Sequence, residues 1–278
     1  MILETHHRAG VRKPKAAGAL ALAVVLAFPV LATAGPAYAA PKADRVQHAA
    51  APSSNVLTAL SNVLGRLLSA PAVAPSVPPP LVSSVSASTV KVTGVACGFR
   101  LSGSGFSPAP DTIVTNAHVV AGTRTPQVLR PDGRTLPATV VTFDPVKDIA
   151  VLSVPNLGLP SLPFGSAVEG ETGGIFGYPQ GRTTVEVSPA RVVRRVVADV
   201  GDIYDRPAAP RRILILSTDI QPGDSGAPLV NGSGQVVGVA FAVANLRRST
   251  AFAVASEDVT PVLARPRAGA VSTGPCIA

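Results

Sequence analysis

The chain has 278 residues, enough for one sizeable domain with appendages or for two small domains. It is 46% hydrophobic and 14% charged, with 25 glycines and 28 prolines, so it can bury a core, and its valine-rich runs broken by Gly and Pro favour strands. The net charge is +8, but the chain has no Trp and only 4% aromatic residues, and no recognition motif accompanies its basic residues, so nucleic acid is not an expected partner.

The first 39 residues have the pattern of an export signal. Basic residues between positions 8 and 15 precede the apolar run Ala16–Ala34, and Ala37–Ala39 offers small residues for cleavage. An uncleaved membrane anchor is the alternative, because the apolar run is nearly long enough to span a bilayer. Pro29 within the run and the cleavage site after it favour removal. We therefore expect residues 1–39 to be a signal peptide and the protein to be secreted or located in the periplasm or cell envelope.

The charge that remains after removal of the signal is mostly arginine. Four of the 24 basic residues and one of the 16 acidic residues would leave with the signal, so the mature chain would carry +5. Many of the arginines stand in doublets, at 194–195, 211–212 and 247–248. We expect them to face solvent, where they could meet an anionic cell-wall polymer. No later segment is apolar for long enough to cross a membrane, so contact with a membrane is expected only through the export signal.

Residues 40–88 are dominated by Ala, Pro, Ser and Val and are expected to form a pro-segment or linker. Pro78–Pro80 would give it a stiff, extended end. A short repeat at 54–67 places five apolar residues on one face of a helix. This amphipathic helix could dock on the domain, lie on a membrane or be discarded with a propeptide, and the sequence leaves these three open.

From about Thr89 the sequence changes to short valine-rich runs separated by Gly, Pro and Asp, which we predict to be strands. Six precede the Pro/Gly-rich stretch 155–174, at 89–96, 99–106, 112–115, 127–129, 138–143 and 149–154. Six follow it, at 175–178, 185–197, 213–218, 227–230, 236–243 and 251–254. No helical pattern lies between them, so the domain 89–278 is expected to be all-β and antiparallel rather than built of βαβ units. A short helix is predicted at about 257–263, with Ser256 as its N-cap.

The chain contains two cysteines, Cys97 near the start of the predicted domain and Cys276 near the end of the chain. In an exported protein an even pair predicts a disulfide rather than two free thiols. It would close a loop of about 180 residues, for which chain entropy gives a stabilisation of roughly 5 kcal/mol.

Counting histidines identifies one candidate base. Of the four in the chain, His6 and His7 lie in the signal and His48 in the linker, which leaves His118 for the domain. A lone histidine is more often structural than catalytic, but His118 ends the tetrapeptide Thr115–His118 at the close of an apolar strand.

An acid that could hold this histidine is Asp148, which opens the apolar run 148–152. A carboxylate at the edge of a buried strand can fix the tautomer of an imidazole and stabilise its charged form. An ordinary turn residue after Lys147 is the alternative interpretation, and Asp144 is the nearest rival acid.

The candidate nucleophile is Ser225, in the octapeptide Gln221–Pro228. A serine between a Gly-Asp pair and a following Gly lies on a tight turn, where the amides of Gly223 and Ser225 can point at one place beside the hydroxyl. That geometry provides a nucleophile together with an oxyanion hole. A Gly/Asp/Pro turn between two strands is the alternative interpretation of this segment.

The order of these residues along the chain excludes several hydrolase classes. His118, Asp148, Ser225 is the chymotrypsin-type order. An α/β-hydrolase or a Gly-Asp-Ser lipase needs a histidine after the serine, and none follows Ser225. The subtilisin order needs an acid before His118, for which only Asp111 is available in the domain. A metal site is not expected, since the domain has one histidine and no clustered ligands.

The segments Thr115–His118, Asp148–Ala150 and Gly223–Gly226 resemble the three signatures of the trypsin-like serine proteases of the chymotrypsin fold. The resemblance extends over about 88–278, and Gly103–Phe106 is similar to bacterial envelope members of that family. It implies two six-stranded antiparallel β-barrels with His118 and Asp148 from the first and Ser225 from the second.

Two features depart from the family pattern. Ala227 stands where a second Gly is usual, and residues 107–110 (Ser-Pro-Ala-Pro) interrupt a strand that is usually apolar. Neither is a member of the triad, so these departures bear on the rate rather than on the class.

The resemblance implies a secreted, monomeric serine endopeptidase that acts on protein or peptide substrates through an acyl-enzyme, with no cofactor. Substrate would pair in β fashion with the strand at Phe241, Ala242 and Val243. Asp219, six residues before the nucleophile, could select basic residues, or it could be structural. A buried Asp224 would need a partner, for which a new N-terminus, Arg182 or Arg191 are the candidates.

The alternative to an enzyme is a catalytically silent, protease-like module that binds a partner in the cell envelope.

Overall fold

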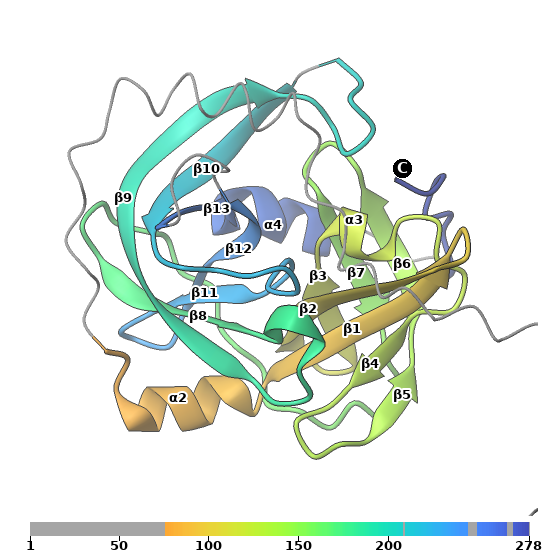
Figure 1. Ribbon diagram of the computed structural model, residues 1–278, viewed down its shortest axis with the longest axis horizontal. Helices are drawn as coiled ribbons and strands as arrows, with labels where there is room; N and C mark the ends of the chain where they lie inside the picture. Colours follow the sequence, from red (N-terminus) through yellow and green to blue (C-terminus); the bar gives the residue numbers. More distant parts are fainter. Residues whose placement is uncertain (1–75, 208, 244–248, 266–268, 278) are drawn as a thin grey trace, which may run out of the picture. The chain divides into compact units, whose positions relative to one another are not determined.

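The computed structural model describes residues 76–207, 209–243, 249–265 and 269–277. They form two antiparallel sheets, the first built from residues 89–153 and the second from residues 172–255 (Figure 1). The predicted signal peptide and the predicted amphipathic helix at 54–67 lie outside the described residues. Among the residues that are described, no helix has both the length and the apolar character that crossing a membrane requires.

The first half is a seven-stranded sheet in the order β5-β4-β1-β2-β3-β7-β6. Its strands are β1 (Thr89–Ala96), β2 (Phe99–Ala109), β3 (Thr112–Thr115), β4 (Gln127–Leu129), β5 (Thr135–Pro137), β6 (Thr139–Asp144) and β7 (Ile149–Ser153). Six of them match the predicted strands, and β5 is additional. The two edge strands β5 and β6 do not pair with each other, so this half is an open sheet instead of a closed six-stranded barrel.

The departure at residues 107–110 is accommodated inside β2. The pairing of β2 with β3 shifts register between Phe106 and Ala109, which is a bulge. Pro108 falls within the bulge, where the missing N–H of a proline costs no ladder hydrogen bond. The strand therefore continues to Ala109 instead of ending at Phe106 as predicted.

The second half is a closed barrel in the order β10-β13-β12-β11-β8-β9. Its strands are β8 (Thr172–Gly177), β9 (Glu186–Val200), β10 (Ala209–Ser217), β11 (Pro228–Asn231), β12 (Val236–Val243) and β13 (Thr250–Ala255). These are the six predicted strands with shifted ends, and all six pair antiparallel. The prediction of an all-β, antiparallel domain is thus confirmed, with one of its two halves closed as a six-stranded barrel.

The short helices differ most from expectation. The helix α2 (Pro79–Ser86) begins within the proline run that was predicted to be an extended stop, because prolines at the first helical positions lose no intrahelical hydrogen bond. The helix α4 (Ser256–Leu263) forms as predicted, but Ala255 is its N-cap and the hydroxyl of Ser256 donates to the carbonyl of Gly165. The other helices among the described residues are α3 (Ala117–Val120) and the 3₁₀ turn η1 (Pro179–Gly181).

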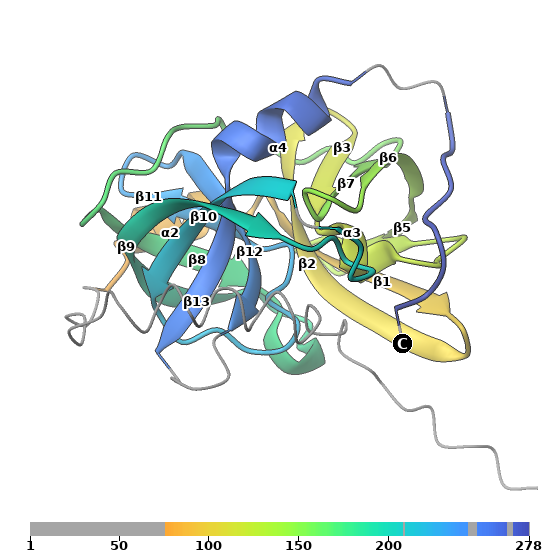
Figure 2. The ribbon, with the colours of Figure 1, turned by 90° about the horizontal axis from the view of Figure 1, so that it is seen from above.

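An apolar cluster joins the two halves. Its buried members include Phe106, Val114, Ile149 and Val151 of the first sheet, Ile213, Val239, Phe241 and Phe252 of the barrel, and Val259 and Val262 of α4. Val85 of α2 is part of the same cluster. In Figure 2, α4 lies across the region where the sheets meet. Burial of this surface holds the two halves in a fixed relation, which the site between them requires.

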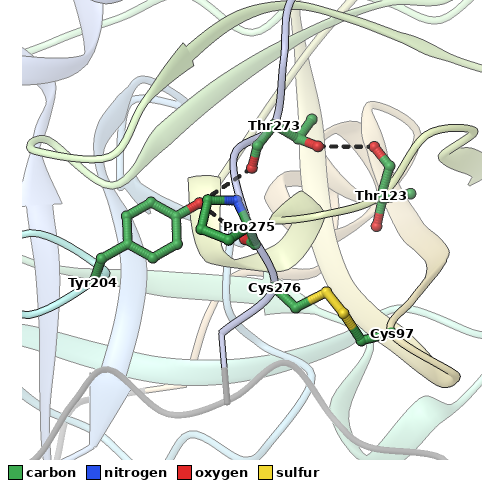
Figure 3. Close-up of a disulfide and its surroundings, with 6 residues drawn as sticks. All are labelled: Cys97, Thr123, Tyr204, Thr273, Pro275 and Cys276. Carbon is green, nitrogen blue, oxygen red and sulfur yellow. Dashed lines mark hydrogen bonds between the residues drawn. A yellow bond between two sulfur atoms is a disulfide. The ribbon is translucent and has the colours of Figure 1, made fainter.

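The predicted disulfide between Cys97 and Cys276 is present in the structure. Cys97 lies at the turn between β1 and β2, and Cys276 lies in the segment 269–277 (Figure 3). The hydroxyl of Tyr204 donates to the carbonyls of Thr273 and Pro275 at 3.1 Å each, and the hydroxyl of Thr273 donates to the carbonyl of Thr123 at 3.0 Å. The last described residues are thus fastened to both halves.

Candidate active site

His118 and Asp148 lie in contact in the first half. His118 is in α3, directly after β3, and Asp148 immediately precedes β7, which pairs with β3. The Nδ1 atom of His118 is 2.8 Å from Oδ2 and 3.0 Å from Oδ1 of Asp148, and the backbone N–H of His118 donates to the same Oδ1 at 3.0 Å. Both residues are at most 2% exposed. The carboxylate therefore fixes the ring and favours the tautomer with the proton on Nδ1.

The backbone around Asp148 is also constrained. Its φ is +55°, in the left-handed region that non-glycine residues seldom occupy. The side-chain amide of Asn116 donates to the Asp148 carbonyl at 2.8 Å and holds the residue in that conformation. At the other end of the imidazole, Nε2 is buried and has no hydrogen-bond partner among the described residues. That nitrogen is free to accept a proton.

Two glycines determine the shape of the loop at residues 221–227, which carries the candidate nucleophile Ser225. Gly223 has φ +106°, and a Cβ there would lie 2.5 Å from the carbonyl oxygen of Tyr178. Gly226 has φ +86°, and a Cβ there would lie 2.1 Å from the carbonyl oxygen of Ser104. Only glycine fits these two positions, and between them Ser225 is half-buried.

Ser104 of β2 fastens this loop to the first sheet. Its N–H donates to the carbonyl of Ser225 and its hydroxyl donates to the carbonyl of Gly223, both at 2.7 Å. Its carbonyl accepts the hydroxyl of Thr115, and its Oγ accepts the N–H of Tyr178. The polar groups of this one serine therefore bond to the loop of Ser225, to β3, which leads to His118, and to Tyr178.

Gly103 shows how closely the two parts of the site approach each other. A Cβ on Gly103 would lie 2.7 and 2.8 Å from the methyl groups of Val119, the residue after His118, and 2.9 Å from the carbonyl oxygen of Ser225. The helix of His118 and the loop of Ser225 thus flank the same glycine. The described structure contains no hydrogen bond between Ser225 Oγ and His118 Nε2, a contact that commonly tightens only when substrate binds.

The amides of Gly223 and Ser225 are available for an oxyanion. Neither donates to a described backbone carbonyl, whereas the amides of Asp224 and Gly226 both do. The carbonyl of the preceding Pro222 accepts the N–H of Gln180 at 2.6 Å, so it is held away from the hole. The predicted pair of oxyanion donors therefore has the required freedom.

The strand predicted to bind substrate has a free edge. Pairing of β12 with β11 ends at Val239, while Ala242 and Val243 pair with β13 on the other side. Among the described strands none covers the second edge of Phe241–Val243, so a peptide could add there. The side chain of Phe241 is buried, with its ring centroid 6.3 Å from that of Phe252, so only its backbone could contact substrate.

Two other acids of this region, Asp144 and Asp219, do not contact His118 in the described structure. Asp144, the rival to Asp148, pairs with Arg265 at 2.5 Å and accepts the N–H of Lys147, so it does not hold the histidine. Asp219 is exposed, one residue before the buried Ile220, and has no described ion pair.

Asp224 is 3% exposed and accepts the N–H of Gln221 at 2.8 Å. Burial raises its pKa to about 6. The two arginines proposed as its partners are engaged elsewhere: Arg182 pairs with Glu186, and Arg191 donates to the carbonyl of Gly170. Those two candidates were wrong.

The sequence did not point to Arg211 as a buried residue. Its doublet was expected to face solvent, but Arg211 is only 2% exposed, while Arg212 is exposed and pairs with Asp258. The guanidinium donates to the carbonyls of Val146 and Gly201. Burial lowers the pKa of Arg211, and the carboxylate of Asp148 is the strongest of four that oppose that effect. Strand alternation within the doublet was the available signal.

In the part of the chain that the structure describes, no group of three or more His, Cys, Asp or Glu side chains could hold a metal ion.

Comparison with known proteins agrees with this geometry. Residues 103–239 match the family described as the trypsin-like peptidase domain. The serine protease Rv3671c of Mycobacterium tuberculosis is 38% identical over 205 residues, which are 71% of this chain and 51% of that protein. The mitochondrial serine protease HTRA2 of Bos taurus is 38% identical over 147 residues, 49% of this chain and 30% of that protein. The chain thus spans about half the length of the first of these relatives and less of the second.

Solved structures show the same similarity. The crystal structure of the Rv3671c protease in its active form covers 76% of this chain and 98% of its own, with a TM-score of 0.69 and 36% identity. The inactive form of that protease covers 77% of this chain and 96% of its own, with a TM-score of 0.60 and 32% identity.

Proposed function

The chain belongs to the trypsin-like serine proteases, and from this we propose that it is an endopeptidase that hydrolyses peptide bonds through an acyl-enzyme on Ser225. The observation that carries the proposal is the pairing of His118 with Asp148. The carboxylate of Asp148 lies within hydrogen-bond distance of Nδ1 of His118, while Nε2 has no hydrogen-bond partner among the described residues. The neighbouring loop provides the hydroxyl of Ser225 and the amides of Gly223 and Ser225. This is the arrangement that acyl transfer needs.

The mechanism follows from the position of each group. Neutral His118 takes the proton of Ser225 as the hydroxyl oxygen attacks the peptide carbonyl. The amides of Gly223 and Ser225 stabilise the oxyanion, and Asp148 stabilises the imidazolium. His118 then gives its proton to the leaving amine. In deacylation His118 takes a proton from water as the water oxygen attacks the acyl carbonyl, and Ser225 Oγ leaves and recovers a proton from His118.

Substrate recognition is proposed to use the free edge of β12. Backbone groups at Phe241, Ala242 and Val243 would pair with the acyl side of an extended polypeptide. Asp219 is proposed to favour Arg or Lys before the cleaved bond. A peptide library that shows no basic preference at that position would remove this role for Asp219.

Secretion is proposed from the export signal and the disulfide. Cys97 and Cys276 form a bond that persists in oxidising compartments, and we propose a secreted or cell-envelope location, a monomeric state and solvent-facing arginines that could meet an anionic cell-wall polymer. N-terminal sequencing of the exported protein tests the cut after Ala39. It would also reveal a second cut that supplies a new amine for Asp224.

The catalytic proposal is tested by labelling with a fluorophosphonate probe and by peptide turnover. Ser225→Ala should abolish labelling and lower kcat by at least about 10⁴-fold. Ser233→Ala, an exposed serine in the turn between β11 and β12, is the matched control and should behave as wild type. A folded wild-type protein that neither labels nor cleaves under any pH or redox condition would instead be a silent binding module.

A further inference from the structure

A pocket of about 530 Å³ that contains two basic side chains lies beside the loop of Ser225. Its lining comes from both halves of the protein: Lys91, Arg100, Ser102 and Gln127 belong to the first sheet, and Gln180 and Gly181 belong to η1. The proposed mechanism uses none of these side chains.

The two walls of the pocket, formed by the first sheet and by η1, both contact the loop of Ser225. In the first wall, Ser102 precedes Gly103, which is packed against the Ser225 carbonyl. In the second wall, the N–H of Gln180 donates to the Pro222 carbonyl, and its side-chain amide donates to Gln221 at 3.0 Å. The pocket therefore lies next to the oxyanion donors, on the side where β2 and η1 meet the loop.

The opposite flank of the loop belongs to β12, because the N–H of Gly226 donates to the carbonyl of Ala240. A polypeptide whose acyl side pairs with β12 must pass over Ser225 and continue away from that strand. The residues after the cleaved bond are thus directed towards β2 and the pocket. This step rests on the proposed function.

The pocket contains a lysine that has no carboxylate partner among the described residues. Lys91 is half-buried, and its Nζ donates to the carbonyls of Gly181 and Arg182 at 2.5 and 3.1 Å, with no carboxylate partner among the described residues. An ammonium has three donors, so one is left for a ligand. Burial lowers the pKa of Lys91, as expected for a cation that lacks a counter-charge. Arg100 also lines the pocket, and the described lining residues include no Asp or Glu.

A second polar group in the wall also lacks a partner. Ser102 is 4% exposed, and its hydroxyl has no hydrogen-bond partner among the described residues. A buried hydroxyl without a partner is uncommon in a folded protein and is often explained by a missing ligand or water. A carboxylate in the pocket could accept from both the ammonium and the hydroxyl.

We propose that this pocket binds an acidic side chain, Asp or Glu, of the polypeptide substrate within the first few residues after the cleaved bond. Lys91 is the residue that sets this preference, with support from Arg100 and the hydroxyl of Ser102. The substrates of the protease are accordingly polypeptides with an acid on the leaving-group side.

The first test uses fluorogenic peptides that are identical up to the cleaved bond and carry Asp, Asn or Lys at each of the next three positions. At one of these positions the Asp peptide should have a kcat/KM about 10-fold above that of the Asn peptide, and added salt should shrink the difference. Lys91→Gln should bring the ratio of Asp-peptide to Asn-peptide kcat/KM close to one. Equal turnover of the Asp and Asn peptides at all three positions would overturn the proposal.

Three further variants distinguish a local effect of the pocket from a general effect of charge. Lys91→Arg should retain the acidic preference, and Arg100→Gln should weaken it even if Lys91→Gln does not fold. Arg134→Gln removes the same charge from the exposed turn between β4 and β5, outside the pocket, and should leave the preference intact. A preference that falls as much in Arg134→Gln as in Lys91→Gln would show a general charge effect and contradict a local pocket.

The second test measures leaving-group-side binding alone. An acyl-enzyme formed from an ester is offered dipeptide amides with Asp or Asn, whose amine attacks the acyl carbonyl while Ser225 Oγ leaves and recovers its proton from His118. The Asp amide should capture several-fold more acyl group than the Asn amide, and Lys91→Gln should equalise them. Hydrolysis of the ester with equal capture would refute only the subsite, whereas absence of ester hydrolysis and of probe labelling would refute the proposed function as well.

Discussion

At the scale of single residues, Asp224 lies in an environment that disfavours its charged form. It is buried beside the candidate nucleophile Ser225, with one backbone N–H as its described hydrogen-bond donor and no described cation as partner. A Cβ on Gly177 would lie 2.2 Å from its Oδ1, so the carboxylate is closely packed there. An ionised carboxylate in such a place costs free energy, and this cost is the cause of its raised pKa.

The raised pKa of Asp224 predicts the direction in which stability changes with pH, and this direction can be measured. Because the folded pKa is about 6 and the unfolded value about 3.8, the native state binds the proton more tightly than the unfolded state between these pH values. Ionisation of Asp224 therefore lowers stability as the pH rises through that window, by up to about 3 kcal/mol. In urea unfolding, Asp224→Asn should gain stability relative to wild type between pH 4 and pH 8. The exposed Asp199→Asn should show no such gain, and equal pH dependence in Asp224→Asn and wild type would contradict the assignment.

At the scale of elements, β10 reaches across to the loop that carries Asp148. The guanidinium of Arg211, on β10, donates to the carbonyl of Val146 and lies with its Cζ 5.9 Å from the centroid of the Phe241 ring. Lys147 of the same loop donates to the carbonyl of Pro210 at 2.8 Å. Two side chains, those of Arg211 and Lys147, thus connect the barrel with the loop of the candidate acid Asp148.

Loss of the Arg211 guanidinium should affect both stability and catalysis. Arg211→Met leaves the carbonyls of Val146 and Gly201 without their donor, which should cost about 1–3 kcal/mol in urea unfolding. The loop should then position Asp148 less well, so kcat/KM for a neutral peptide should fall about 10-fold. Arg194→Met, at an exposed arginine 4.0 Å from Glu169, should change neither by much. Destabilisation with full activity would show that Arg211 does not position Asp148.

The strands were predictable because valine-rich runs with Gly and Pro boundaries are a local signal. β5 was missed because three residues ending in a proline give almost no periodicity, and α2 was missed because a proline run was taken as extended. The candidate triad followed from counting one domain histidine. The hydrogen bonds of Ser104 and the burial of Arg211 depend on segments about 120 and 65 residues away in sequence, and no local pattern reports such contacts.

At the scale of the whole domain, the segment 269–277 links distant parts. The carbonyl of Thr273 accepts the N–H of Gly122, close to the end of α3, and Ile277 packs against the cluster formed by Ala117, Ala121 and Ile203. The disulfide to Cys97 secures this segment to the first sheet across 179 positions of sequence. The helix of His118 is therefore covered by the last described part of the chain.

Reduction of the disulfide should destabilise the domain and loosen the cover over α3. Chain entropy predicts that the free energy of unfolding falls by roughly 5 kcal/mol when Cys97 and Cys276 are replaced by Ser. Urea unfolding of wild type with and without a phosphine reductant measures the effect, and the double variant should not respond to the reductant. Unfolding midpoints that are unchanged on full reduction would show that the segment is held by its other contacts alone.

The role of Ser104 bears on how such proteins could change in evolution. Since the backbone and hydroxyl of this one residue align the two halves of the site, a substitution there can remove hydrolysis while both cores stay folded. Binding proteins that retain a protease fold could arise from this chain by a change at Ser104, with Ser225 itself still in place.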